Sequence, residues 1–132
     1  MADDFDRVKG FLGDLGLRIV KEDAAEELFV VEDEDIGVKN LVIDCERPIL
    51  VLEQLIMEVP KGVDGDFYRR LLQMNRNLVH GAFALDEAAG YVVFRDTLQL
   101  ENLDLNELEG SVNALSLALA ENASELLQFA HS

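Results

Sequence analysis

The residues of this chain that could perform chemistry are few and scattered. The sequence holds one cysteine, Cys45, and two histidines, His80 and His131, and none has a second His or Cys at the spacing of a zinc site. We expect His80 near the end of a helix, where a cationic ring meets the negative end of the dipole. We expect Cys45 on a strand as a small buried side chain. This pattern predicts no catalytic residue.

Two segments have the composition of ligand loops but not their context. The acidic run EDEDIG at 32–37 is similar to part of a calcium loop, but the spacing and the distal Glu of an EF-hand are missing. Gly10, Gly13 and Gly16 fall inside or at the end of an expected helix, so they cannot cradle a phosphate between a strand and a helix. We expect Gly10 and Gly13 to allow close approach to a sheet or a partner. The sequence therefore predicts that the protein binds no metal or cofactor and is not an enzyme.

The charge of the chain restricts its partners. It has 27 acidic and 11 basic residues, a formal net charge of −16. Phosphate contacts need clustered Lys and Arg, so we expect no nucleic acid partner. Residues 22–35 contain eight carboxylates and no base, whereas Arg69, Arg70 and Arg76 make one helix basic. The acidity either maintains solubility or provides a surface for a basic protein partner.

Length and composition indicate one domain spanning residues 1–132. A single cysteine excludes an intramolecular disulfide and suits a reducing compartment. We find no secretory signal pattern, and no apolar run is longer than the one at 49–52, which is far shorter than the ~20 residues that cross a bilayer. We expect a cytoplasmic protein with no membrane partner.

The helices that would position these residues have clear sequence signals. Asp3 or Asp4 can cap a first helix that ends at Gly16. A second helix is expected to begin after Asp64 or Asp66 and to end at Gly81. The third begins at Asp104, where Glu107 completes a variant of the capping box.

Six apolar segments predict strands, and a bulge is expected near Asp96 in the last of them. They span residues 17–21, 28–31, 41–45, 49–59, 82–86 and 91–100. Residues 17–21 form either a full strand or only a short edge, so the number of early strands could differ by one. We predict an α+β fold, an antiparallel sheet with helices packed on it, in the order α-β-β-β-α-β-β-α.

Surplus apolar residues predict a contact beyond the domain core. The strand from 49 is apolar on both faces at its start, which requires either helices on both sides or a contact with another subunit. The second helix carries a further partly apolar face. The expected dimer contact comprises Ile49, Val51, Tyr68, Leu72 and Val79.

The segment LLQMN, containing Leu71, Leu72 and Asn75, carries a family resemblance together with the elements C-terminal to it. Those elements are a strand ending in LD at 85–86, Gly90, a second strand, the stretch LQLENLD and a long closing helix. This arrangement resembles the Tir-chaperone (CesT-like) superfamily of small, acidic, homodimeric secretion chaperones. It is equally similar to the YbjN-type proteins, which share that fold.

The resemblance implies a non-enzymatic homodimeric protein-binding module that holds an extended client segment. In the resembling families the second helix and neighbouring strands form the dimer contact. The alternative is a YbjN-type regulatory or signalling interaction protein that holds no client. The strand PILVLEQLIMEVP is more similar to the YbjN group, which disfavours a type III secretion client.

We expect a client to lie extended along the sheet and the first helix. Its apolar anchors would be Phe5, Val8, Phe29 and Val31, unless these residues form ordinary core. The carboxylates that would border this surface and attract basic residues are Glu32, Asp33, Glu34 and Asp35.

Overall fold

The computed structural model describes residues 3–131 as a six-stranded antiparallel sheet with three α-helices. In chain order the elements are α1 (Asp4–Asp14), β1 (Arg18–Asp23), β2 (Leu28–Asp33), the short 3-10 helix η1 (Glu34–Ile36), β3 (Val38–Glu46), β4 (Ile49–Glu58), α2 (Gly65–Arg76), β5 (Ala82–Leu85), β6 (Tyr91–Gln99) and α3 (Leu105–Ala130). The predicted fold class is confirmed. Four strands precede α2, one more than in the expected order and within the difference that the sequence allows.

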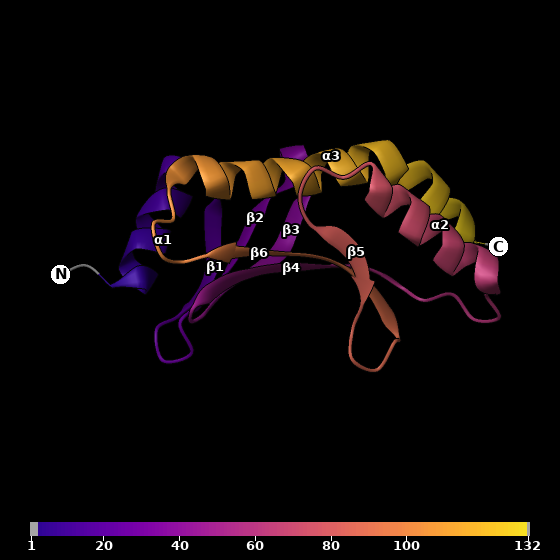
Figure 1. The fold of residues 1–132 in the computed structure, drawn as a ribbon, viewed down its shortest axis with the longest axis horizontal. Coiled ribbons are helices and arrows are strands. Elements are labelled where there is room, and N and C mark those ends of the chain that lie inside the picture. Colours follow the sequence, from indigo (N-terminus) through magenta and orange to yellow (C-terminus); the bar gives the residue numbers. More distant parts are fainter. Residues whose placement is uncertain (1–2, 132) are drawn as a thin grey trace.

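The strands lie in the order β1-β2-β3-β4-β6-β5, and every neighbouring pair is antiparallel. The chain therefore builds a four-stranded meander, crosses the sheet through α2, and returns to place β5 at the outer edge. All three helices lie on one side of the sheet, with α3 running along its length (Figure 1). The other side of the sheet carries no helix from residues 3–131.

Short polar side chains fix where the first and last helices begin. Asp3 accepts a hydrogen bond from the backbone N–H of Asp6 at 2.8 Å, and Asp104 accepts one from Glu107 at 2.8 Å. These bonds satisfy N–H groups that have no partner inside the first turn. Gly16 follows α1 with φ +73°, a left-handed conformation that suits glycine. The predicted starts of α1 and α3 and the predicted end of α1 are confirmed.

The second helix ends earlier than predicted. It stops at Arg76, and the chain then runs irregularly through 77–81 before entering β5. Gly81 is required at this entry, because its φ is +72° and an added Cβ would lie 2.4 Å from the Phe94 ring. His80 therefore does not lie at a helix end. Its ring lies beside Gly110 of α3, within van der Waals reach of a Cβ added there.

The bulge expected near Asp96 is also misplaced. Asp96 pairs regularly with Leu52, and the register of β4 with β6 shifts instead between Leu55 and Met57. Asp96 faces the helices, where its carboxylate accepts a 2.6 Å hydrogen bond from the Ser111 hydroxyl of α3. A polar residue at this position is thus satisfied by the helix that covers it.

The core lies between the helix layer and one face of the sheet. Phe5 of α1 stacks on Phe29 of β2 with ring centroids 4.4 Å apart. Cys45 belongs to this core, as predicted. The other core residues from the sheet include Val31, Leu41, Ile43, Leu50, Leu52, Val92 and Phe94. Helices thus cover only one of the two apolar faces of β4.

Candidate interaction surfaces

The apolar residues expected to anchor a client lie in the core. Phe5 is 6% exposed, and Val8, Phe29 and Val31 are fully buried between α1 and the sheet. The expectation that these four side chains present a client surface is therefore wrong for this structure. The helix that carries two of them covers the strand that carries the other two. Their alternative interpretation as ordinary core fits the structure.

The four neighbouring carboxylates do lie together, at one end of the sheet. Glu32 and Asp33 are the last residues of β2, and Glu34 and Asp35 are the first of η1. Together with Arg18 they line a shallow hollow. Glu32 forms an ion pair with Arg18 on the adjacent strand β1. Asp33, Glu34 and Asp35 form no ion pair within residues 3–131. This acidic rim begins directly after Val31, but Val31 itself is buried and offers no apolar surface beside it.

Three of the expected dimer residues are exposed on the helix side of the molecule. Tyr68 and Leu72, four residues apart on α2, are 37% and 72% exposed, and Val79 in the following segment is 81% exposed. Leu117 of α3 is also exposed. With Val79 it lines a groove of about 300 Å³ between α3 and the segment that follows α2. We call Tyr68, Leu72, Val79 and Leu117 the helix-side patch. The sequence does not single out Leu117, because this residue lies off the apolar stripe of α3.

The other two expected dimer residues lie elsewhere. Ile49 and Val51 are at the start of β4, where they pair with Gln99 and Thr97 of β6. Neither packs in the core between the sheet and the helices. The structure therefore divides the five expected dimer residues between two surfaces on opposite sides of the sheet.

Asn75 attaches α2 to the edge strand β5. Its side-chain amide donates to the backbone carbonyl of Phe83 at 3.0 Å, and its amide oxygen accepts from the Phe83 N–H at 2.7 Å. One side chain thus replaces both backbone bonds that a neighbouring strand would make at this residue. This bonding explains why the LLQMN segment is followed so closely by a strand.

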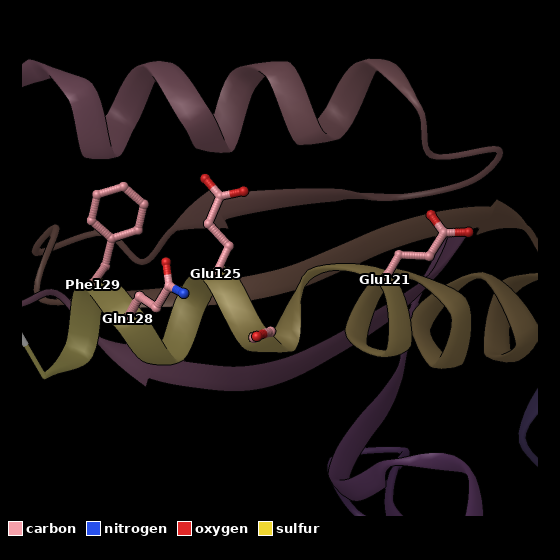
Figure 2. Close-up of a pocket in the computed structure, with 5 residues that line it drawn as sticks. Glu121, Glu125, Gln128 and Phe129 are labelled. Atoms are coloured by element: carbon pink, nitrogen blue, oxygen red, sulfur yellow. The ribbon is translucent and has the colours of Figure 1, made fainter.

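A bidentate ion pair attaches α2 to α3. The Arg70 guanidinium donates to the two carboxylate oxygens of Glu125 at 2.6 and 2.8 Å. Arg70 holds the pKa of Glu125 below its usual value, since its hydrogen bonds favour the ionised form. Figure 2 shows Glu125 and Phe129 pointing from α3 in the same direction, and the Phe129 ring lies 5.1 Å from that of Phe67 on α2. The corner that carries the helix-side patch is therefore held at several points.

A second ion cluster fixes the opposite end of the molecule. Arg47, in the turn between β3 and β4, donates to both carboxylate oxygens of Glu27 and to Asp4 of α1. The hydrogen bond from Arg47 holds the pKa of Glu27 below its usual value. Arg7 of α1 donates at 2.6 Å to the carbonyl of Leu100. The basic residues at this end stabilise the fold.

Asp44 and Cys45 are neighbours on β3 with opposite orientations. Burial raises the pKa of the Cys45 thiol to about 11, so the reactive thiolate is disfavoured. Asp44 faces the side of the sheet without helices, where burial and the nearby Glu46 carboxyl raise its pKa to about 6. Its Oδ1 is buried and has no hydrogen-bond partner within residues 3–131. Neither residue is arranged as a nucleophile or a ligand pair.

The described part of the chain, residues 3–131, contains no group of three or more His, Cys, Asp or Glu side chains that could hold a metal ion. No helix in that part has the length and apolar composition needed to cross a membrane. Gly10 and Gly13 lie within α1, and a Cβ added at either would meet no atom within 4 Å. They therefore do not allow close approach to the sheet, and close approach to a partner stays a prediction. The features that can interact are surfaces.

These features define a small sheet-and-helix domain with exposed apolar and acidic surfaces. The chain belongs to the CesT_Tir_1 family, whose model matches residues 1–132. No curated protein sequence matches it.

Solved structures share this fold at low sequence identity. YbjN from E. coli superposes with a TM-score of 0.69 and 16% identity, covering 92% of each chain. A chain of the ExoU–SpcU complex from the type III secretion system of Pseudomonas aeruginosa gives 0.66 and 20%, covering 92% of this chain and 96% of that one. A chain from the complex of the Yersinia pestis type III secretion chaperone SycH with a fragment of YscM2 gives 0.61 and 17%, covering 89% and 98%. The predicted resemblance to both groups is confirmed at the level of the fold.

Proposed function

We propose that this chain is a non-enzymatic, homodimeric protein-binding module of the cytoplasm that holds an extended client segment. Residues 1–132 act as one domain in this proposal. The observation that carries it is the helix-side patch, because Leu72 and Val79 are the two most exposed of the large apolar side chains in residues 3–131. Exposed apolar groups that gather on one side of a soluble domain indicate a protein contact.

The helix-side patch fits a second copy of the chain. Hydrogen bonds from Asn75 and Arg70 hold α2 in place, so little conformational freedom is lost when its outer face is covered. A twofold dimer uses the same patch on both copies, so the exposed apolar side chains of each copy can be covered by those of the other. Each Å² of apolar surface covered stabilises the dimer by about 25 cal/mol before the costs of association.

The client role is supported by the relatives. Two of the similar structures are complexes of a type III secretion protein with a second protein. The acidic rim of Asp33, Glu34 and Asp35 would attract basic residues of a client, mainly by accelerating encounter at low salt. Glu32 contributes less to this attraction because it is already paired with Arg18.

YbjN superposes as well as any of these structures, which favours a second candidate function. In that case the chain would be a regulatory interaction module that binds a folded partner. The two functions differ in the state of the partner before binding.

One experiment separates the two functions. A tagged chain is used to capture proteins from the lysate of its host, and each captured protein is then purified and bound alone. A client-holding module should protect a segment that is extended and protease-sensitive in the free partner. Binding to a folded partner that gains no protection would favour the regulator, and the absence of any stoichiometric protein would contradict both functions.

A further inference from the structure

The side of the sheet without helices has a buried apolar centre although no helix of residues 3–131 covers it. Val51 and Val93 are only 9% and 5% exposed, although neither belongs to the core between the sheet and the helices. An antiparallel sheet with one wet face normally shows polar residues there. The apolar residues of this open face include Leu28 and Val30 of β2, Val42 of β3, Ile49, Val51 and Leu55 of β4, and Val93 of β6.

Asp44 lies among these apolar residues. Leu28 and Val51 are its direct partners on the two adjacent strands, and Val42 precedes it by two residues on the same face. Its Oδ1 is buried and unbonded within residues 3–131, and the next residue on this face of β3 is another acid, Glu46. A carboxylate in such surroundings is costly unless a cation pairs with it.

Other carboxylates on the same face do have a basic partner. Glu53 of β4 accepts from Arg95 on β6 at 3.2 Å, and Glu32 of β2 pairs with Arg18 on β1. Asp44 is more enclosed than an ordinary surface acid and forms no ion pair within residues 3–131. The missing element at this position is a positive charge that has apolar groups around it.

A second copy of the chain is a poorer source of that charge. Arg18 and Arg95 on the open face already pair with Glu32 and Glu53, and stacking open face on open face would bring two Asp44–Glu46 pairs together. Like charges across an interface oppose association. The occupant that complements this face is therefore a different protein segment with basic character.

We propose that the open face binds a protein segment that places a Lys or Arg side chain on Asp44 and apolar side chains on Val42 and Val51. This proposal rests on the proposed function, since it assigns a surface to the client. It replaces the buried residues of α1 and β2 as the apolar part of the client site. The apolar contacts supply affinity, and the pairing with Asp44 supplies specificity for a basic residue.

The test begins with a library of random 12-residue peptides displayed on phage and selected against the full chain. Selected peptides should share a Lys or Arg flanked by apolar residues. The tightest peptide is then labelled and titrated by fluorescence anisotropy against the wild type and variants. Asp44→Asn should weaken binding at least tenfold, because it removes one partner of a desolvated charge pair. Glu87→Gln, which removes the same charge from an exposed turn, should change binding less than twofold.

A charge exchange makes the assignment specific. A peptide with Glu in place of its basic residue should fail on the wild type and regain binding on Asp44→Lys. Circular dichroism confirms that each variant is folded. Binding of the basic peptide to Asp44→Asn within twofold of the wild type, or a selection that enriches no basic residue, would overturn the proposal.

The outcome can be distinguished from failure of the proposed function. If Asp44→Asn captures the host client as well as the wild type does, the open-face proposal is wrong and the proposed function stands. If the wild type captures no host protein while selected peptides depend on Asp44, the open face is a binding site and the client-holding function is wrong.

Discussion

Asn75 and Asp44 are polar side chains in apolar surroundings, and their hydrogen bonding gives them opposite effects on stability. The Asn75 amide makes one bond in each direction with the backbone of Phe83. The Asp44 carboxylate leaves one oxygen buried without a partner in residues 3–131. Removing a satisfied group costs free energy, whereas neutralising an unsatisfied charge releases it.

Asp44→Asn should stabilise the protein at neutral pH. Burial and Glu46 raise the pKa of Asp44 from 3.8 to about 6, so the folded chain retains a proton that the unfolded chain has already lost. The free energy of unfolding therefore falls as pH rises across this interval, and the loss is complete above it. Urea denaturation at pH 7 should show the variant more stable by about 1 kcal/mol. An equal gain at pH 3, where Asp44 is neutral in both states, would contradict this cause.

Asn75→Ala should reduce the free energy of unfolding by about 2 kcal/mol, because the N–H and C=O of Phe83 both lose their partner. Asn106→Ala is the matched control, since Asn106 is exposed on α3 and bonds no other side chain within residues 3–131. That control should change stability by less than about 0.5 kcal/mol. Equal effects of the two substitutions in urea denaturation would show that Asn75 does not hold α2.

At the scale of the elements, the sequence predicted what local chemistry decides. Capping by Asp3 and Asp104 and the left-handed Gly16 depend on residues within one turn, so the sequence alone predicts them. The end of α2 depends on how the chain enters β5, where Gly81 meets Phe94 from a distant strand. The apolar spacing continues past Arg76, so the sequence predicts a longer helix.

The interaction surfaces could not be predicted correctly from the sequence for a related reason. Alternation along a strand shows that two faces differ, but it does not show which face a helix covers. The residues expected to anchor a client therefore proved to be core, while no helix covers the face that carries Val51. The sequence predicts a bulge at Asp96 because the partner that satisfies this residue, Ser111, lies on another element.

The contact of α2 with α3 gives a prediction at this scale. A double-mutant cycle with Arg70→Ala and Glu125→Ala should give a coupling energy of about 0.5–1 kcal/mol, because the pair is bidentate but partly exposed. Since the pKa of Glu125 is lowered in the folded state, the coupling should be complete above pH 5 and disappear as the pH falls and Glu125 is protonated. A coupling unchanged by acid or by added salt would contradict an ionic contact.

At the scale of the whole molecule, the two uncovered apolar surfaces lie on opposite sides of the sheet. The helix-side patch consists of exposed apolar side chains, and the open face is apolar around the Asp44 carboxylate. In our proposals, a second copy covers the first surface and a basic partner binds the second. A dimer joined through its helix-side patches would leave both open faces free.

Leu72→Asp combined with Val79→Asp should convert the dimer to a monomer. Each new carboxylate would have to be buried in the contact, while both positions are highly exposed in one copy, so the fold should persist. Leu55→Asp is the matched control, because Leu55 is 57% exposed on the open face. Light scattering at micromolar concentration should give the mass of a dimer for the wild type and Leu55→Asp. A monomeric wild type would contradict the dimer, and a monomeric Leu55→Asp would move the contact to the open face.

Native mass spectrometry of the complex captured by the tagged chain in its host tests the central claim most directly. The proposed function predicts a particle with two copies of this chain and a second polypeptide, whose bound segment becomes protease-sensitive when it is released. A particle with one copy of this chain and no second polypeptide would contradict it.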